Sequence, residues 1–152
     1  MHLYTYLDML ARAEENLARC YRQVATAHTA DADVSFACAA FAREADEHVA
    51  ALAPALDRYA DRAEEPPERL HAICPGPPRT GPIGLLRDLA DLHQLATLVE
   101  STWQLIAQAA QGARDRDLIA VCGECTSRTT AQLAWLSMRQ KSDAAQTLLV
   151  AT

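Results

Sequence analysis

The sequence predicts an all-α protein, folded as an antiparallel four-helix bundle. Half of the 152 residues are hydrophobic, yet only 5% are aromatic and only five are glycine, a composition that favours helix over strand. Apolar residues recur at steps of three and four through four long segments, as they do along one face of a helix. A chain of this length buries roughly two thirds of its unfolded surface around one core. We therefore expect a single domain over residues 1–152.

The first helix is expected from Leu3 to His28. Its apolar stripe comprises Leu3, Tyr6, Leu7, Leu10, Ala13, Leu17, Tyr21 and Val24. Glu14 is the exception on this face, since at 100° per residue it lies about 40° from the centre of the stripe. A carboxylate buried in mid-helix costs free energy unless it is paired. Glu14 is therefore a candidate for a site in the core.

A short turn at residues 29–33 leads into a second helix, expected over residues 33–61. Asp31 and Asp33 are both suitable N-caps, because their side chains can accept from free backbone N–H groups. A connection this short joins two helices that run in opposite directions. The first two helices should therefore form a hairpin.

The second helix carries a histidine within its apolar stripe. The stripe contains Val34, Ala37, Cys38, Phe41, Ala45, His48, Val49, Leu52, Ala55, Leu56 and Tyr59. Glu44 lies at its edge, and Asp46 and Glu47 lie outside it. Pro54 removes a backbone hydrogen bond and is expected to kink or open this helix near Ala50.

A long proline-rich connection is expected over residues 64–84. It holds six of the seven prolines and three of the five glycines, so it cannot be helical throughout. A segment of this length can run the whole length of a bundle. We therefore expect a crossover that returns the chain to the end at which the second helix began.

The third helix is expected over residues 85–111, with two distinct apolar stripes. One stripe, which includes a histidine and a glutamate, comprises Leu85, Leu89, Leu92, His93, Ala96, Val99, Glu100, Trp103, Ala107 and Ala110. Leu95, Leu98 and Leu105 form a second stripe on the opposite face, which an isolated bundle would leave in water. An exposed apolar stripe indicates an interface, so we expect a homodimer or larger homo-oligomer through these leucines.

The fourth helix is expected over residues 117–141, after a turn in which Gly112 is the natural C-cap. Its core face comprises Leu118, Cys122, Cys125, Thr129, Leu133 and Leu136. Arg128 lies near the edge of this face and Glu124 points away. No acid or histidine is available on the core face of this helix.

These features resemble the ferritin-like superfamily, most closely its rubrerythrin-like members. The resemblance rests on two features: Glu14 lies seven residues before Tyr21, and residues 43–49 have the sequence READEHV. It implies a ferritin-like bundle in which Glu14, His48 and Glu100 match ligands of a di-iron centre. The resemblance therefore implies iron as the cofactor.

The sequence also departs from the pattern of that family. Ala45 stands where the bridging glutamate is expected, three residues before His48, and Glu44 could replace it only from the edge of the face. Arg128 falls level with Glu100 and would repel cations. We therefore favour two metal-free pairs, Glu14 with His48 and Glu100 with Arg128, over a metal site at Glu14, Glu44, His48 and Glu100.

Histidine and cysteine leave further alternatives open. His93 is most simply a core or bundle-end histidine, and haem binding by His48 and His93 has no other support. Cys20, Cys38, Cys122 and Cys125 lie on core faces and weakly resemble the thiols of copper-storage bundles, which use many more. Buried cysteine is often only a small apolar residue, and Cys122 and Cys125 do not lie at a helix N-terminus that would activate a redox pair.

Charge and hydropathy exclude several classes of partner. The net charge is −6, and no run of Lys or Arg could neutralise a line of phosphates, which argues against nucleic acid. No signal-like N-terminus or apolar run of 18 residues is present, so we expect a soluble cytoplasmic protein with no membrane partner. The expected function is a non-catalytic binding or structural subunit of a homo-oligomer or larger complex. The alternative is an iron-binding redox or storage protein.

Overall fold

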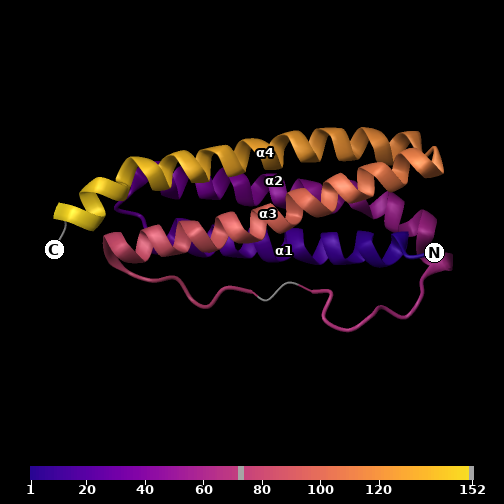
Figure 1. Cartoon of the computed structure of the whole chain (residues 1–152), viewed down its shortest axis with the longest axis horizontal. Helices are drawn as coiled ribbons and strands as arrows, with labels where there is room; N and C mark the ends of the chain where they lie inside the picture. The colour runs from indigo at the N-terminus through magenta and orange to yellow at the C-terminus, as the bar shows by residue number, and fades with distance from the viewer. Residues whose placement is uncertain (72–73, 151–152) are drawn as a thin grey trace.

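The computed structural model describes residues 1–71 and 74–150 of the chain. Within these residues the backbone forms four long helices, α1 (Leu3–Ala27), α2 (Ala32–Tyr59), α3 (Gly81–Ala113) and α4 (Arg116–Ala145), and contains no strand. A short η1 (Ala60–Arg62) follows α2, and a π-helical turn, η2 (Gln146–Val150), follows α4. The long helices lie side by side (Figure 1). The prediction of an all-helical protein is confirmed.

The helices pack mainly as two pairs. α1 packs most extensively on α2, α3 packs most extensively on α4, and α1 also packs on α3. Polar contacts join α2 and α4 at both ends. Asp33 early in α2 accepts from Arg139 late in α4 at 2.6 Å, whereas Arg58 late in α2 donates to Asp115 just before α4 at 2.9 Å.

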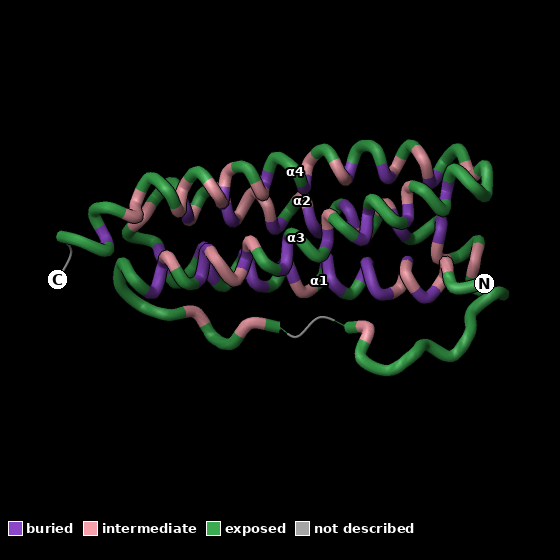
Figure 2. The backbone as a smooth tube through the Cα atoms, in the orientation of Figure 1, coloured by how far each residue is buried: buried purple, intermediate pink, exposed green. Residues whose placement is uncertain are grey.

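The core lies where the apolar stripes of the four helices meet. Figure 2 shows buried positions recurring along each of the four helices. The largest fully buried side chains are Trp103, Tyr21, Leu7, Leu10, Leu17, Leu52, Leu89, Leu92, Ile106, Leu118, Leu136 and His48. Each buried leucine of this kind stabilises the fold by roughly 1.5–3 kcal/mol through removal of apolar surface from water. The helical periodicity therefore identified the buried faces.

The third helix begins earlier than the sequence indicated. The structure starts α3 at Gly81 instead of Leu85, with Pro82 in its first turn. Proline is favourable there because the first-turn N–H groups have no intrahelical partner. Residues 81–84 therefore belong to the helix and not to the connection. Pro54 lies inside α2, and the helix continues through it without a break from Ala32 to Tyr59.

The turn between α3 and α4 uses an arginine where glycine was expected. Gly112 is still part of α3, and Arg114 adopts the left-handed conformation with φ 56°. Asp115 N donates to Ala110 O at 3.0 Å and Arg114 N donates to Gln111 O at 3.1 Å. These bonds satisfy the last carbonyls of α3 and offset the steric cost of a non-glycine residue at positive φ. The prediction of Gly112 as C-cap is wrong.

Asp115 is the N-cap of α4 and also joins it to α2. Its carboxylate accepts from Leu118 N at 3.0 Å, from Arg58 at 2.9 Å and from Tyr59 Oη at 2.9 Å. Burial acts to raise the pKa of Asp115, but these hydrogen bonds outweigh it and lower the pKa below its usual value. The carboxylate therefore stays charged at neutral pH and holds the end of α2 against the start of α4.

Replacing Asp115 by alanine should lower the free energy of unfolding by about 1–2 kcal/mol at pH 7, because the cap and its cross-helix contacts are lost. The loss should shrink as the pH falls through the lowered pKa of Asp115, since the wild-type carboxylate then loses its charge. Urea unfolding of both proteins between pH 7 and pH 3 measures this. Asp117→Ala, at the second residue of α4, is the control and should change stability less.

The second stripe of α3 is narrower than predicted. Leu95 is only 6% exposed and belongs to the core, whereas Leu98 and Leu105 are 38% and 56% exposed. α3 packs on both α4 and α1, so its buried arc is wide enough to include Leu95. Leu95 is therefore not part of an exposed face, and only two of the three leucines remain available to a partner.

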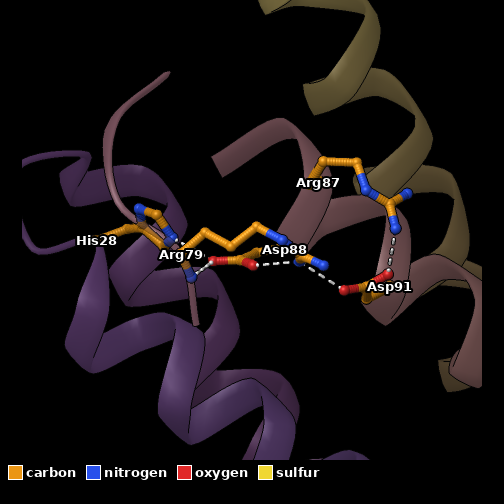
Figure 3. Close-up of polar contacts among 5 residues, drawn as sticks. All are labelled: His28, Arg79, Arg87, Asp88 and Asp91. Carbon is orange, nitrogen blue, oxygen red and sulfur yellow. Dashed lines mark hydrogen bonds and ion pairs between the residues drawn. The ribbon is translucent and has the colours of Figure 1, made fainter. Parts of the chain in front are cut away.

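Residues 63–71 and 74–80 of the connection between α2 and α3 run along the outside of the helices (Figure 1). Its C-terminal end docks on the start of α3 through Asp88, which is 4% exposed. The Asp88 carboxylate accepts from Arg79 N at 2.9 Å and from the Arg79 guanidinium at 2.9 Å, and lies 2.7 Å from His28 Nε2 (Figure 3). Gly84 permits this approach, because a Cβ there would lie 2.9 Å from the Cβ of Arg79.

Candidate functional site

A buried carboxylate contacts two other helices near the middle of the structure. Glu14 of α1 accepts a hydrogen bond at Oε1 from Trp103 Nε1 of α3 at 2.8 Å, and the same oxygen lies 2.9 Å from His48 Nδ1 of α2. Glu14, His48 and Trp103 are each at most 1% exposed. The predicted pairing of Glu14 with His48 is confirmed. Trp103 was assigned only to the core, and its indole N–H is the partner that sequence reasoning missed.

The two ring nitrogens of His48 differ in their hydrogen bonding. Because Oε1 accepts from both donors, we assign a proton to Nδ1 of the imidazole. Nε2 is buried and is one of two described side-chain atoms of this kind without a hydrogen-bond partner. The Trp103 ring meets the His48 ring edge to face, with centroids 6.0 Å apart at 85°. Packing therefore holds the imidazole in one orientation.

Glu44 belongs to a second buried polar chain. Tyr21 Oη donates to Gln132 Oε1 at 2.9 Å, and Gln132 Nε2 donates to Glu44 Oε2 at 2.8 Å. Burial raises the pKa of Tyr21 well above its usual value, and nearby Cys38 and Glu14 add to the shift. Tyr21 therefore remains a hydrogen-bond donor. Glu44 is turned toward α4 and is not part of the contact between Glu14 and His48.

Glu100 and Arg128 do not form the predicted pair. Glu100 is half-buried and accepts from Thr130 Oγ1 at 2.8 Å. Arg128 instead donates to Glu47 of α2 and to Glu124 at 3.2 Å. Residues 128 and 130 lie about 200° apart around α4, so one faces α2 while the other faces α3. The pairing of Glu100 with Arg128 is wrong because the two residues share a level but not a side of the bundle.

The four candidate metal ligands are distributed over three separate contacts. Glu14 meets His48, Glu44 meets Gln132 and Glu100 meets Thr130. Ala45, fully buried, occupies the position expected of the bridging carboxylate. Within residues 1–71 and 74–150 no three potential ligands converge. Because a di-iron centre requires about four carboxylates and two histidines around two ions, this donor set does not fit one.

His93 is separate from this site. It is half-buried and lines a surface pocket with Ala90, Ser137, Gln140 and Lys141. His48 lines a different cavity, toward α4. The structure therefore gives no support to a haem shared by His48 and His93, and a cationic lysine accompanies His93 instead.

The thiols on the core faces are buried and reduced. Cys20, Cys38, Cys122 and Cys125 are buried, and Cys74 on the connection is exposed. Burial raises the pKa of Cys20 and Cys122 to about 11, and that of Cys38 and Cys125 to about 12. A raised pKa suppresses the thiolate, which is the reactive form. Cys122 and Cys125 therefore lack the activation that a redox pair needs.

We expect one fast-reacting thiol per folded chain, Cys74, because the other four thiols are buried and have raised pKa values. Titration with a chromogenic disulfide reagent at pH 8 should show one rapid equivalent and release the other four only in denaturant. Cys74→Ser should abolish the rapid phase. A rapid phase that persists in this variant would contradict the burial of the remaining thiols.

A partly enclosed cavity of about 110 Å³ opens beside His48, between α2 and α4. Its lining includes His48, Cys125, Glu47, Glu124 and Arg128. His48 and Cys125 were each predicted on the core face of their helix, but not beside one cavity. The sequence could have indicated this only through a comparison of how far along the bundle each of the two residues lies.

Comparisons with protein-family models, with curated proteins and with solved structures gave no match for this chain. The description of the site therefore rests on its own geometry. In the part of the chain that the structure describes, no helix combines the length and hydropathy required to cross a membrane.

Proposed function

We propose that this chain is a ferritin-like bundle without di-iron chemistry, acting as a non-catalytic binding or structural subunit. The observation that carries the proposal is the hydrogen bonding of Glu14 Oε1, which is taken up by Trp103 Nε1 and His48 Nδ1. A carboxylate held in this way satisfies buried donors and need not coordinate a metal. Buried polar side chains thus occupy the positions at which the resemblance implies iron ligands.

The helix contacts support the ferritin-like topology within this proposal. Asp33 with Arg139 and Arg58 with Asp115 join opposite ends of α2 and α4, as an antiparallel arrangement requires. The described parts of the connection, residues 63–71 and 74–80, run beside the helices between the end of α2 and the start of α3 (Figure 1), as a crossover between two hairpins would. These features distinguish the proposed bundle from one with three short loops.

Iron binding tests the proposal. Protein purified without a tag and mixed anaerobically with Fe(II) should retain less than one equivalent per chain after desalting, and should not accelerate iron oxidation when air is admitted. Stoichiometric iron that is lost in a Glu14→Ala, Glu100→Ala double variant would overturn the proposal. That result would establish the alternative, an iron protein using Glu14, Glu44, His48 and Glu100. Glu15→Ala, Glu124→Ala is the matched control for removal of two charges.

We further propose that the subunit self-associates through Leu98 and Leu105 of α3. Both side chains are exposed, and Leu105 lines an apolar hollow of about 230 Å³ with Leu3, Tyr6 and Ile106. A second copy of the chain would remove this surface from water. Leu98→Glu should convert the oligomer to monomer in sedimentation velocity. Leu149→Glu, at an exposed position in η2, should leave it unchanged, and an oligomer that survives Leu98→Glu would refute this interface.

A further inference from the structure

A broad hollow of about 750 Å³ lies at the end of the bundle where α2 ends and α4 begins. Figure 1 shows the end of α2 and the turn between α3 and α4 at this same end of the molecule. Four exposed arginines line the hollow, Arg58 and Arg62 from α2 and η1, and Arg114 and Arg116 from the turn and the start of α4. The two pairs are far apart in the sequence, so only the fold brings them together. We call this feature the basic hollow.

The basic hollow has a net positive charge in a chain whose overall net charge is −6. Asp115 and Asp117 are the acidic residues of its lining. The Asp115 carboxylate pairs with Arg58 at 2.9 Å, so these two charges compensate each other. Within residues 1–71 and 74–150 the other three arginines pair with no acidic side chain. Three guanidinium groups are therefore available to an anion.

The backbone of Arg114 supports a role for its side chain. Arg114 adopts the left-handed conformation with φ 56°, in which a residue with a Cβ crowds its own backbone and glycine does not. The turn between α3 and α4 requires this conformation but makes no use of a guanidinium. Residues held in such conformations are frequent at ligand sites. The basic hollow, which Arg114 lines, gives a reason for an arginine at this position.

The start of α4 adds to the positive potential. Arg116 and Asp117 are the first two residues of this 30-residue helix, and both line the basic hollow. Backbone N–H groups at a helix start have no intrahelical acceptor and form the positive end of the helix dipole. The Asp115 side chain accepts from one of these groups, Leu118 N, at 3.0 Å. The dipole thus acts in the same direction as the three arginines.

We propose that the basic hollow binds the oligophosphate group of a small molecule, represented by inorganic triphosphate, through Arg62, Arg114 and Arg116. A guanidinium is planar and permanently charged, and it donates pairs of N–H groups to phosphate oxygens. Several guanidinium groups around a hollow of this volume suit a chain of phosphates better than a single one. The size is that of a small-molecule site, and one local cluster does not follow the backbone of a nucleic acid.

Isothermal titration calorimetry with inorganic triphosphate tests the site. At about 0.15 M salt the protein should bind one triphosphate per chain, with an affinity that falls as the salt concentration rises. Sulfate at equal ionic strength should compete only weakly, because it offers a single compact anion. Competition by sulfate as strong as that by triphosphate would mean general attraction of anions and would overturn the proposal.

Two charge variants locate the binding. Arg62→Gln, Arg116→Gln should weaken triphosphate binding by about tenfold or more, because charge-assisted hydrogen bonds are lost. Arg19→Gln, Arg43→Gln is the matched control, since it removes the same charge from exposed positions outside the basic hollow, and should leave the affinity unchanged. Equal affinities of the two double variants would overturn the proposal.

Asp117→Asn should tighten triphosphate binding, because it removes a carboxylate that lines the basic hollow and opposes the anion. Titration of this variant measures the gain. An unchanged or weaker affinity would show that triphosphate does not bind beside Asp117, and would overturn the proposal.

Arg114→Gly separates binding from a merely structural role. Glycine adopts the left-handed conformation without strain, so this variant should unfold at a higher urea concentration than wild type. Its affinity for triphosphate should nevertheless fall by about tenfold, because a guanidinium is lost. A variant that is more stable and binds triphosphate as tightly as wild type would remove Arg114 from the site and overturn the proposal.

Titration with ATP identifies which source of the group the site prefers. Tighter binding of ATP than of triphosphate would favour a nucleotide, with Tyr59 of the lining available to contact the base. Equal affinities would favour free oligophosphate, and both results support the proposal. Absence of binding by both compounds to the folded protein would overturn it. These outcomes are independent of the proposed function, which fails only on stoichiometric iron that depends on Glu14 and Glu100.

Discussion

Replacing Glu14 by alanine should lower the free energy of unfolding by about 3–5 kcal/mol, the largest effect we expect from a single substitution in this chain. The change removes the acceptor shared by Trp103 Nε1 and His48 Nδ1. Both donors are buried, so the loss of this oxygen leaves them without a hydrogen-bond partner in the core. Urea unfolding followed by circular dichroism measures the loss.

The neighbouring acid provides the control for this prediction. Glu15 is exposed on the same helix, so Glu15→Ala should change stability by no more than about 0.5 kcal/mol. Glu14→Gln retains an acceptor oxygen of similar shape and should cost less than Glu14→Ala. Equal stabilities for Glu14→Ala and Glu15→Ala would show that the contact among Glu14, His48 and Trp103 contributes nothing to the fold.

Asp88→Ala should destabilise the protein by about 2–4 kcal/mol and release the connection from the start of α3, because it leaves buried donors unpaired. His28 Nε2 and the backbone N–H of Arg79 both lose their partner, and the Arg79 guanidinium loses one of its two carboxylates (Figure 3). Limited trypsin digestion should cut after Arg79 faster than in wild type, and urea unfolding should show the loss of stability.

The pattern of effects distinguishes docking of the connection from a general loss of stability. Asp57, exposed on α2, is the control, and Asp57→Ala should leave both readouts near wild type. Arg79→Ala should accelerate cleavage after Arg69 with a smaller loss of stability, because the Asp88 carboxylate keeps its contact with His28. Unchanged digestion of Asp88→Ala would contradict this account of the docking.

Helical phase predicted the burial of Glu14 and His48, but not that of Asp88 and Gln132. Glu14 and His48 lie on the apolar stripes of their helices, and two adjacent helices joined by a short turn place such residues against one another. Trp103 was assigned to the core by the same criterion. Its contact with Glu14 was not predicted, because it depends on how far α3 is rotated and shifted relative to α1.

For Glu100, Arg128 and Leu95, the information missing from the sequence was the rotation of each helix about its axis. Glu100 and Arg128 were matched by level along the hairpin, but Arg128 faces α2 and Thr130 faces Glu100. Leu95 was placed on an exposed stripe, but contacts of α3 with two helices bury it. Levels along a hairpin follow from counting residues, whereas the side that each residue faces depends on packing.

The sequence by itself determined the helical class, the four long segments and the burial of Glu14 and His48, because period and composition are local properties of the chain. Only the tertiary structure decided which donors surround Glu14, that Glu44 and Glu100 contact other partners, and that His48 and Cys125 line one cavity between α2 and α4. Those outcomes depend on the rotation and offset of whole helices, which are set by the packing of many side chains at once.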